Sequence, residues 1–144
     1  MQFSSARCGA AAALLAITAP CCGAAAQAAG PYDGVWYVTI ACANAPDGAA
    51  GYTLQLTAQV RGGAIFGRFS STATAAQATL SGRIGPDGSA ALQVDGRTGD
   101  VVYSVGRVQP GTPYHYTANG RFAGNTGAAR RNELRACDLT FRRG

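Results

Sequence analysis

The chain has 144 residues, with twelve arginines and no lysine against seven acidic residues, and a formal net charge of +5 at pH 7. This length allows one domain with a single core and excludes two, and the balance of charge is only mildly basic. One histidine in the whole chain leaves few groups for acid–base catalysis, so we do not expect an enzyme.

The first 28 residues have the features of a bacterial-type secretory signal helix. The uncharged apolar run from Ala10 to Ala19 is too short to span a bilayer. Ala26 and Ala28 place small residues at the positions that signal peptidase reads, so we expect cleavage after Ala28. A lipoprotein signal using Cys21 or Cys22 is the alternative, and it fits poorly because the residues before both cysteines depart from the lipoprotein pattern. The sequence therefore predicts a periplasmic or secreted protein.

The mature domain, residues 29–144, keeps two of the five cysteines, Cys42 and Cys137. Exported compartments are oxidising, so we expect these two residues to form a disulfide. Cys42 is in phase with Trp36, and Cys137 is in phase with Phe141. Both thiols should therefore point into the core.

Hydrophobic and polar residues alternate along most of the mature domain, and no stretch sustains the spacing of an amphipathic helix. A period of two predicts an all-β domain whose strands have one buried face and one exposed face. Eight strands are predicted, near residues 35–42, 52–60, 64–69, 78–84, 90–97, 101–107, 114–122 and 136–142.

The connections favour a meander of antiparallel neighbours. Short turn signals, rich in Gly, Asp and Pro, lie at residues 61–63, 85–88 and 97–100. Longer breaks, which we expect to gather at one end where a binding site would lie, are residues 43–51, 70–77, 110–113 and 123–131. An eight-strand antiparallel up-and-down barrel would pair the first and last strands, which fits a bond between the two cysteines. A Greek-key β-sandwich is the alternative.

The segment Gly34-Val35-Trp36-Tyr37 resembles the Gly-x-Trp opening of the first strand in the calycin group, the lipocalins and avidins. The resemblance implies an eight-strand meander barrel with a Trp packed at the closed end and often an Arg lying across it. Trp36 matches the Trp, and Arg107 is the candidate for the Arg. Small periplasmic inhibitors of secreted metalloproteases are also similar in size, export, barrel type and opening motif, although their single disulfide lies within the early part of the barrel.

Three further segments resemble a group of small exported proteobacterial proteins, and this resemblance implies no particular activity. The segments are Tyr32-Asp33-Gly34, Gly111-Thr112-Pro113-Tyr114 and Cys137-Asp138-Leu139-Thr140-Phe141.

Four residues are candidates for binding because alternation places them inside the barrel. Arg107 is in phase with Tyr103, and a buried guanidinium would need a carboxylate or an aromatic face, from the protein or from a ligand. Tyr114 and Tyr116 share the inward face of their strand. Eight strands leave room for one small ligand or none, and these bulky side chains predict a mostly filled core.

Arg130, Arg131 and Arg135 are candidates for a basic rim that contacts an anionic partner, or that simply solvates one face. His115 is on the exposed face of its strand, and a lone histidine with both cysteines in a disulfide predicts no metal site and no cofactor.

The sequence thus predicts a non-catalytic binding or interaction module, with a carrier of a small apolar ligand and a protease-inhibitor-like protein as alternatives. The expected partner is an envelope protein, an anionic surface or a small ligand, and no nucleic acid is expected.

Overall fold

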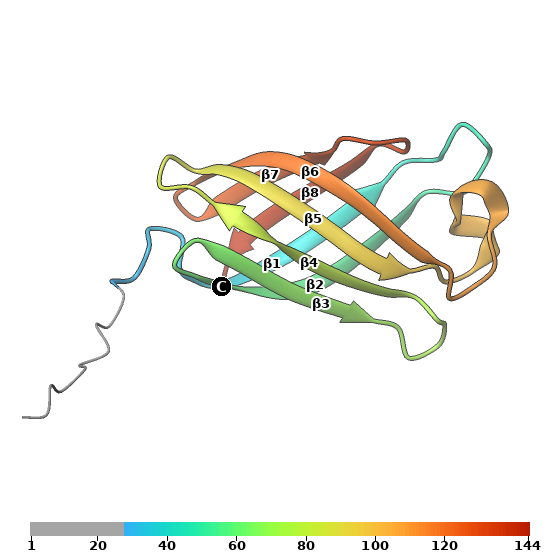
Figure 1. The fold of residues 1–144 in the computed structure, drawn as a ribbon, viewed down its shortest axis with the longest axis horizontal. Helices are drawn as coiled ribbons and strands as arrows, with labels where there is room; N and C mark the ends of the chain where they lie inside the picture. The colour runs from blue at the N-terminus through green and yellow to red at the C-terminus, as the bar shows by residue number, and fades with distance from the viewer. Residues whose placement is uncertain (1–27) are drawn as a thin grey trace, which may run out of the picture.

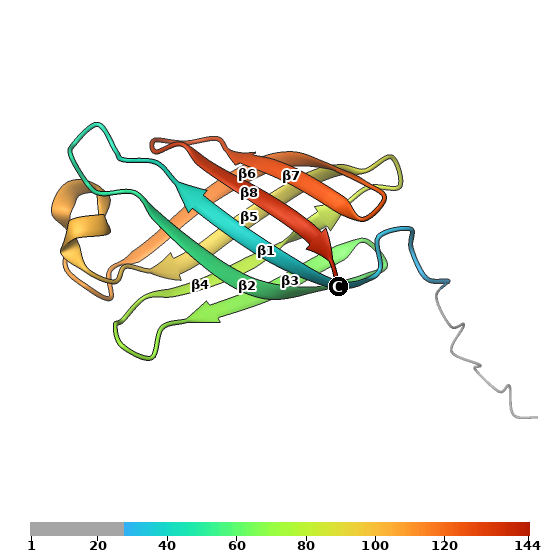
Figure 2. The same ribbon diagram turned by 180° about the vertical axis from the view of Figure 1, so that it is seen from behind.

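The computed structural model describes residues 28–144, so the predicted signal peptide lies outside the described residues except for Ala28. The described chain forms a closed antiparallel barrel in which each strand pairs with its sequence neighbour (Figures 1 and 2). The strands are β1 (Gly34–Cys42), β2 (Tyr52–Arg61), β3 (Ala64–Ser70), β4 (Gln77–Ile84), β5 (Ser89–Arg97), β6 (Pro113–Ala123), β7 (Thr126–Arg131) and β8 (Cys137–Arg143). Within residues 28–144, no helix is long and apolar enough to cross a membrane.

The barrel closes between the first and last strands, as the sequence predicted, and the sandwich alternative is wrong. Figure 2 shows β8 beside β1, and their antiparallel register places Cys42 directly opposite Cys137. The two residues form a disulfide, and both are buried. The inward residues of all eight strands build one hydrophobic core, because the period of two gives each strand a single apolar face.

One predicted strand is wrong, and another was missed. Residues 101–107 form two short 3₁₀ helices, η1 (Val101–Tyr103) and η2 (Val105–Arg107), in which the Asp100 carboxylate caps the first and Gly106 adopts a left-handed φ of 72°. The strand that was missed is β7, which lies in a segment predicted to be a loop. Its inward residues, Gly127 and Ala129, are too small to give a hydrophobic alternation.

One end of the barrel is closed by aromatic packing. Trp36 is completely buried, its ring meets that of Phe122 edge to face at 5.1 Å, and its indole nitrogen donates to the Tyr32 carbonyl at 2.8 Å. The guanidinium of Arg143 lies over the indole, with its carbon 5.1 Å from the ring centre. The arginine across the tryptophan is therefore Arg143, and the prediction that Arg107 has this place is wrong.

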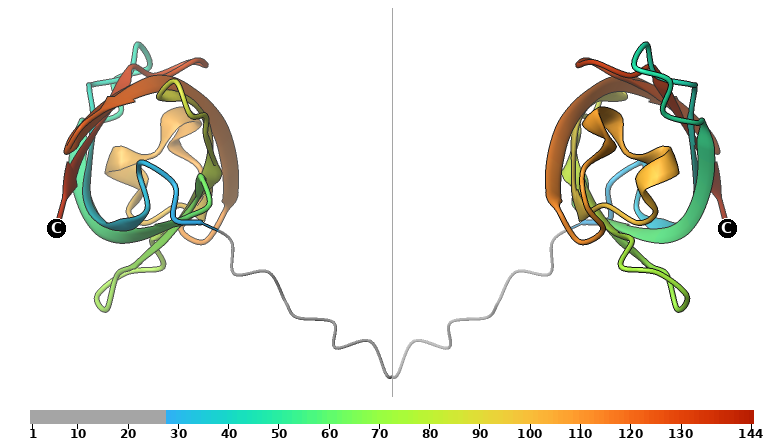
Figure 3. Two further views of the ribbon diagram at one scale, coloured as in Figure 1. Left: turned by 90° about the vertical axis from the view of Figure 1, so that its left-hand side faces the viewer. Right: turned by 90° about the vertical axis from the view of Figure 1, so that its right-hand side faces the viewer.

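The longer connections gather at the other end. They are residues 43–51, 71–76, 98–112 and 132–136. Three of the four predicted long breaks are among them, whereas the fourth, 123–131, contains the tight β6–β7 turn at the closed end and then the whole of β7. Figure 3 shows the segment carrying η1 and η2 lying across the opening of the barrel. The open end is thus the place where irregular backbone meets the interior.

Candidate functional site

A cavity of about 470 Å³ opens at the end where the long connections gather. Its apolar wall comes from the inward faces of the strands and from the segment across the opening, and includes Tyr52, Leu54, Phe69, Tyr103 and Tyr114. The hydrophobic core fills the barrel as far as Cys42, Cys137 and Tyr116, and the cavity lies at the mouth beyond them.

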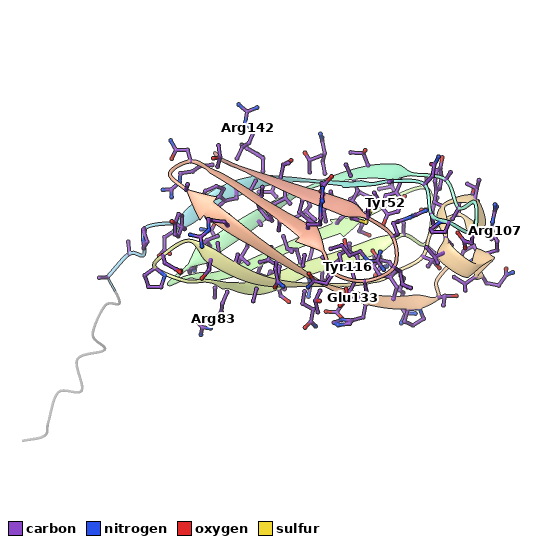
Figure 4. The ribbon with its side chains drawn as sticks, turned by 90° about the horizontal axis from the view of Figure 1, so that it is seen from above. Tyr52, Arg83, Arg107, Tyr116, Glu133 and Arg142 are labelled. Atoms are coloured by element: carbon purple, nitrogen blue, oxygen red, sulfur yellow. A yellow bond between two sulfur atoms is a disulfide. The ribbon has the colours of Figure 1, made fainter. Side chains whose placement is uncertain are left out.

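The tyrosines of the cavity are positioned by their strands. Tyr114 and Tyr116 are two residues apart on β6, and their rings stack with an interplanar angle of 8° and centroids 6.1 Å apart. Gly96 lies opposite Tyr114 in the β5–β6 register, and a Cβ atom there would come within 2.5 Å of the tyrosine ring, so only glycine leaves space for this ring. Tyr52 meets Tyr103 edge to face, with centroids 6.5 Å apart. Figure 4 shows Tyr52 and Tyr116 inside the barrel.

Burial raises the pKa of Tyr52, Tyr114 and Tyr116 above the ordinary value of 10.0, because the phenolate would lose its hydration. For Tyr52 the nearby Arg135 and Arg131 oppose this shift without cancelling it. The three hydroxyls therefore keep their protons at neutral pH and can donate hydrogen bonds. The Tyr114 hydroxyl lies 3.3 Å from the Gln77 carbonyl, to which it donates.

Arg135 is buried at the open end, with 3% of its surface exposed. Its Nη1 donates to the Tyr103 carbonyl at 2.9 Å, and its Nη2 donates to the carbonyls of Ala49 and Ala50 at 3.0 and 2.9 Å. The guanidinium also lies over the Tyr52 ring, with its carbon 5.3 Å from the centroid. One side chain thus joins three of the long connections and fixes the shape of the opening.

Arg131 ends β7 and points inward in phase with Ala129. Its guanidinium carbon lies 4.2 Å from the centre of the Tyr116 ring, a cation–π contact. Its Nη1 is 3.9 Å from the sulfur of Cys137, and its Nε is buried without a hydrogen-bond partner among the described residues. Arg131 therefore rests on an aromatic face and lacks an oxygen acceptor for its Nε.

Positive charge dominates the wall of the cavity. Three guanidinium groups contribute to it, from Arg97, Arg131 and Arg135, whereas the single carboxylate of the lining is that of Asp100. That carboxylate accepts a hydrogen bond from the backbone of Val102 at 3.0 Å. No ion pair involves Arg131 or Arg135 in the described part of the chain, whose two ion pairs are His115–Asp95 and Arg130–Asp138.

The structure separates the residues predicted as binding candidates. Tyr103 and Tyr114 line the cavity, and Tyr116 lies beneath Arg131. The prediction that Arg107 points inward is wrong: Arg107 is exposed on the segment across the opening, as Figure 4 shows, and donates to the Gly48 carbonyl at 3.0 Å. Its displacement follows from the 3₁₀ geometry that replaces the predicted strand.

The three arginines of the predicted rim have different surroundings. Arg130 is exposed on the outer face of β7 and pairs with Asp138 at 3.0 Å, whereas Arg131 and Arg135 belong to the interior. Arg135 could have been placed from the sequence, since it precedes Cys137 by two residues and shares its inward phase. Leu134, which lines the opening although 84% of its surface is exposed, was not predicted.

Residues 28–144 contain no group of three His, Cys, Asp or Glu side chains that could hold a metal ion. No family model, curated protein or solved structure matches this chain. Function is therefore inferred from the geometry of the open end.

Proposed function

We propose that this domain is a non-catalytic binding protein that holds one small, largely apolar ligand in the open end of its barrel. The observation that supports this proposal is the 470 Å³ cavity, which has the size and the aromatic and aliphatic lining typical of small-molecule sites. Mouths of barrels are among the places where such sites occur. An eight-strand barrel has room for one such ligand.

The lip of the cavity also supports a binding role. Leu134 is an exposed leucine with a φ of 55°, a backbone conformation that costs energy for a residue with a Cβ atom. An exposed apolar residue in a strained conformation is unusual in a loop that only connects two strands. Such strain clusters at ligand sites. Leu134 is placed where it would cover one side of a bound molecule.

The segment with η1 and η2 would form the other side of the opening. It is tied to the 43–51 connection, because Ala50 donates to the Val102 carbonyl at 2.8 Å and the Asp47 carboxylate accepts from the Gly106 amide. These hydrogen bonds and those of Arg135 hold the opening in shape before a ligand arrives. A preformed site of this kind binds at a lower entropic cost than a disordered one.

Fluorescence titration with the neutral apolar probe N-phenyl-1-naphthylamine tests this proposal. We expect saturable binding of one probe per chain, and we expect Leu54→Trp to weaken it at least tenfold by occupying the cavity. Tyr37→Trp is the matched control, since Tyr37 lies on the outer face with 59% of its surface exposed. Absence of saturable binding, or equal binding by both variants, would refute the proposal and favour a protein partner that contacts the loops.

We also propose that the protein is exported and that the signal is cleaved after Ala28. The disulfide between Cys42 and Cys137 is compatible with an oxidising compartment. Intact-mass measurement on protein expressed with its own leader tests this. A mass for residues 29–144 less two hydrogens, in the periplasmic or extracellular fraction, is the expected result, and a retained leader would contradict the proposal.

A further inference from the structure

We propose that the ligand of the open-end cavity carries a single carboxylate, which pairs with the guanidinium of Arg131 while an aromatic or branched apolar body lies among the tyrosines. This inference rests on the proposed binding function and assigns its ligand class. It comes from the one inward-pointing arginine of the cavity to which residues 28–144 supply no oxygen acceptor.

The placement of Arg131 is costly unless something pairs with it. Its Nε is buried without a partner among the described residues, and its Nη1 donates to the sulfur of Cys137 at 3.9 Å, a weak acceptor. The ring of Tyr116 stabilises the cation through its face, but it leaves the hydrogen-bonding edges of the guanidinium unused. Those edges are arranged to bind a planar carboxylate through two parallel hydrogen bonds.

The closed end provides an internal comparison. Arg143 has a similar arrangement, with its guanidinium over the Trp36 ring and a buried Nε without a partner. There, however, the N-terminal segment supplies an acceptor, because Nη2 donates to the Pro31 carbonyl at 2.7 Å. At the open end, no described residue supplies an oxygen acceptor to Arg131, and the cavity occupies the corresponding place.

Arg135 adds positive charge to the cavity but is less available than Arg131 to pair with a ligand carboxylate. Its Nη1 and Nη2 already donate to three backbone carbonyls, although its Nε, like that of Arg131, is buried without a partner among the described residues. Its charge still adds to the positive potential of the cavity. One open guanidinium edge with a second charge behind it fits a monoanion better than a phosphate dianion, which would need more donors.

Nearby carboxylates do not neutralise this potential. The Glu133 carboxylate accepts from the backbone amide and the hydroxyl of Thr117 on the outer face of β6, and Glu133 is exposed. Asp100 accepts from the Val102 amide at the edge of the opening. Neither carboxylate lies within ion-pairing distance of Arg131, although Glu133 feels its charge.

The test compares two competitors of the same shape, 2-naphthoate and the neutral 2-naphthamide, by displacement of N-phenyl-1-naphthylamine from the purified protein with its disulfide intact. We expect the naphthoate to bind at least tenfold more tightly than the naphthamide, since a charge-assisted pair in an apolar site adds roughly one to two orders of magnitude in affinity. Arg131→Gln should remove most of this preference, measured as the ratio of the affinities of the two competitors for the same variant. Arg131→Lys, which keeps the charge without the fork, should retain part of it.

Arg130→Gln is the matched control, because it removes the same charge from the outer face of the same strand and should leave the preference unchanged. Failure of the neutral probe to bind refutes the proposed function itself. Probe binding without a preference for naphthoate refutes only the carboxylate assignment, as does a preference that Arg131→Gln leaves undiminished. If Arg131→Gln fails to fold, the wild-type preference and Arg131→Lys decide, and a preference equal in both would overturn the bidentate pairing.

Discussion

Removal of the Cys42–Cys137 disulfide should cost the barrel a large part of its stability. The bond joins residues 95 positions apart in sequence, and the two lie opposite each other where β1 and β8 close the barrel. In the chain-entropy account, cross-linking a loop of this length stabilises the folded state by about 4–5 kcal/mol, through restriction of the unfolded chain. That amount is comparable to the whole stability of many small domains.

The experiment compares three proteins by thermal and urea unfolding: the oxidised wild type, the reduced wild type and the double variant Cys42→Ala with Cys137→Ala. The difference between oxidised and reduced wild type isolates the cross-link, because both sulfur atoms remain in the core. The difference between the reduced wild type and the double variant isolates the loss of packing. For a domain of this size, 4–5 kcal/mol corresponds to a decrease in Tm of roughly 15–25 °C.

Reductant should have no effect on the double variant, which serves as the control for nonspecific action. Oxidised and reduced wild type that unfold within about 1 kcal/mol of each other would refute the reasoning. In that case the unfolded chain would already hold its ends together, or the native bond would be strained enough to offset its entropic contribution.

Trp36→Ala should lower the free energy of unfolding by about 3–5 kcal/mol, and Tyr37→Ala, on the outer face, by far less; equal losses in urea unfolding would contradict the closed-end packing. The three inward tyrosines of the open end, Tyr52, Tyr114 and Tyr116, should ionise at a higher pH than free tyrosine. Because folding raises their pKa, the stabilisation they provide is complete below about pH 10 and is lost as the pH rises through the folded pKa, which tyrosinate absorbance followed with circular dichroism will show. Asp47→Asn should speed amide exchange at Gly106, the donor to that carboxylate, whereas Asp87→Asn at the closed end should not.

The barrel could be predicted because its signals are local and repeated. Alternation assigns a face to each residue, tight turns make sequential strands neighbours, and the shared inward phase of Cys42 and Cys137 closes the sheet. The prediction of one strand was wrong although its residues alternate regularly. Residues 101–107 alternate as a strand does, but the capping carboxylate of Asp100 and the left-handed Gly106 favour 3₁₀ turns instead.

The site was less predictable than the fold, because the sequence does not mark Arg131 as an interior residue or show what Arg135 contacts. Arg131 follows a strand whose other inward residues are Gly127 and Ala129, so nothing in its neighbourhood marks the inward phase. Arg135 precedes β8 and could be placed by counting back from Cys137, yet its three carbonyl partners come from connections far away in sequence. A cluster of arginines near the end of a chain therefore does not imply a basic surface.

The cavity itself depends on strand register, which no single segment encodes. At the closed end, Phe122 faces Gly127 across the β6–β7 ladder, and a Cβ atom on that glycine would come within 2.8 Å of the ring, so a large and a small residue together fill the space. At the open end of the same ladder, Arg131 faces Ala118 and leans over Tyr116. A shift of one residue in this register would turn Arg131 outward and Arg130 inward, and would break the pair between Arg130 and Asp138. The chemistry of the cavity thus follows from how β6 and β7 align, and the carboxylate preference of the wild type together with its loss in Arg131→Gln is the measurement that links this alignment to binding.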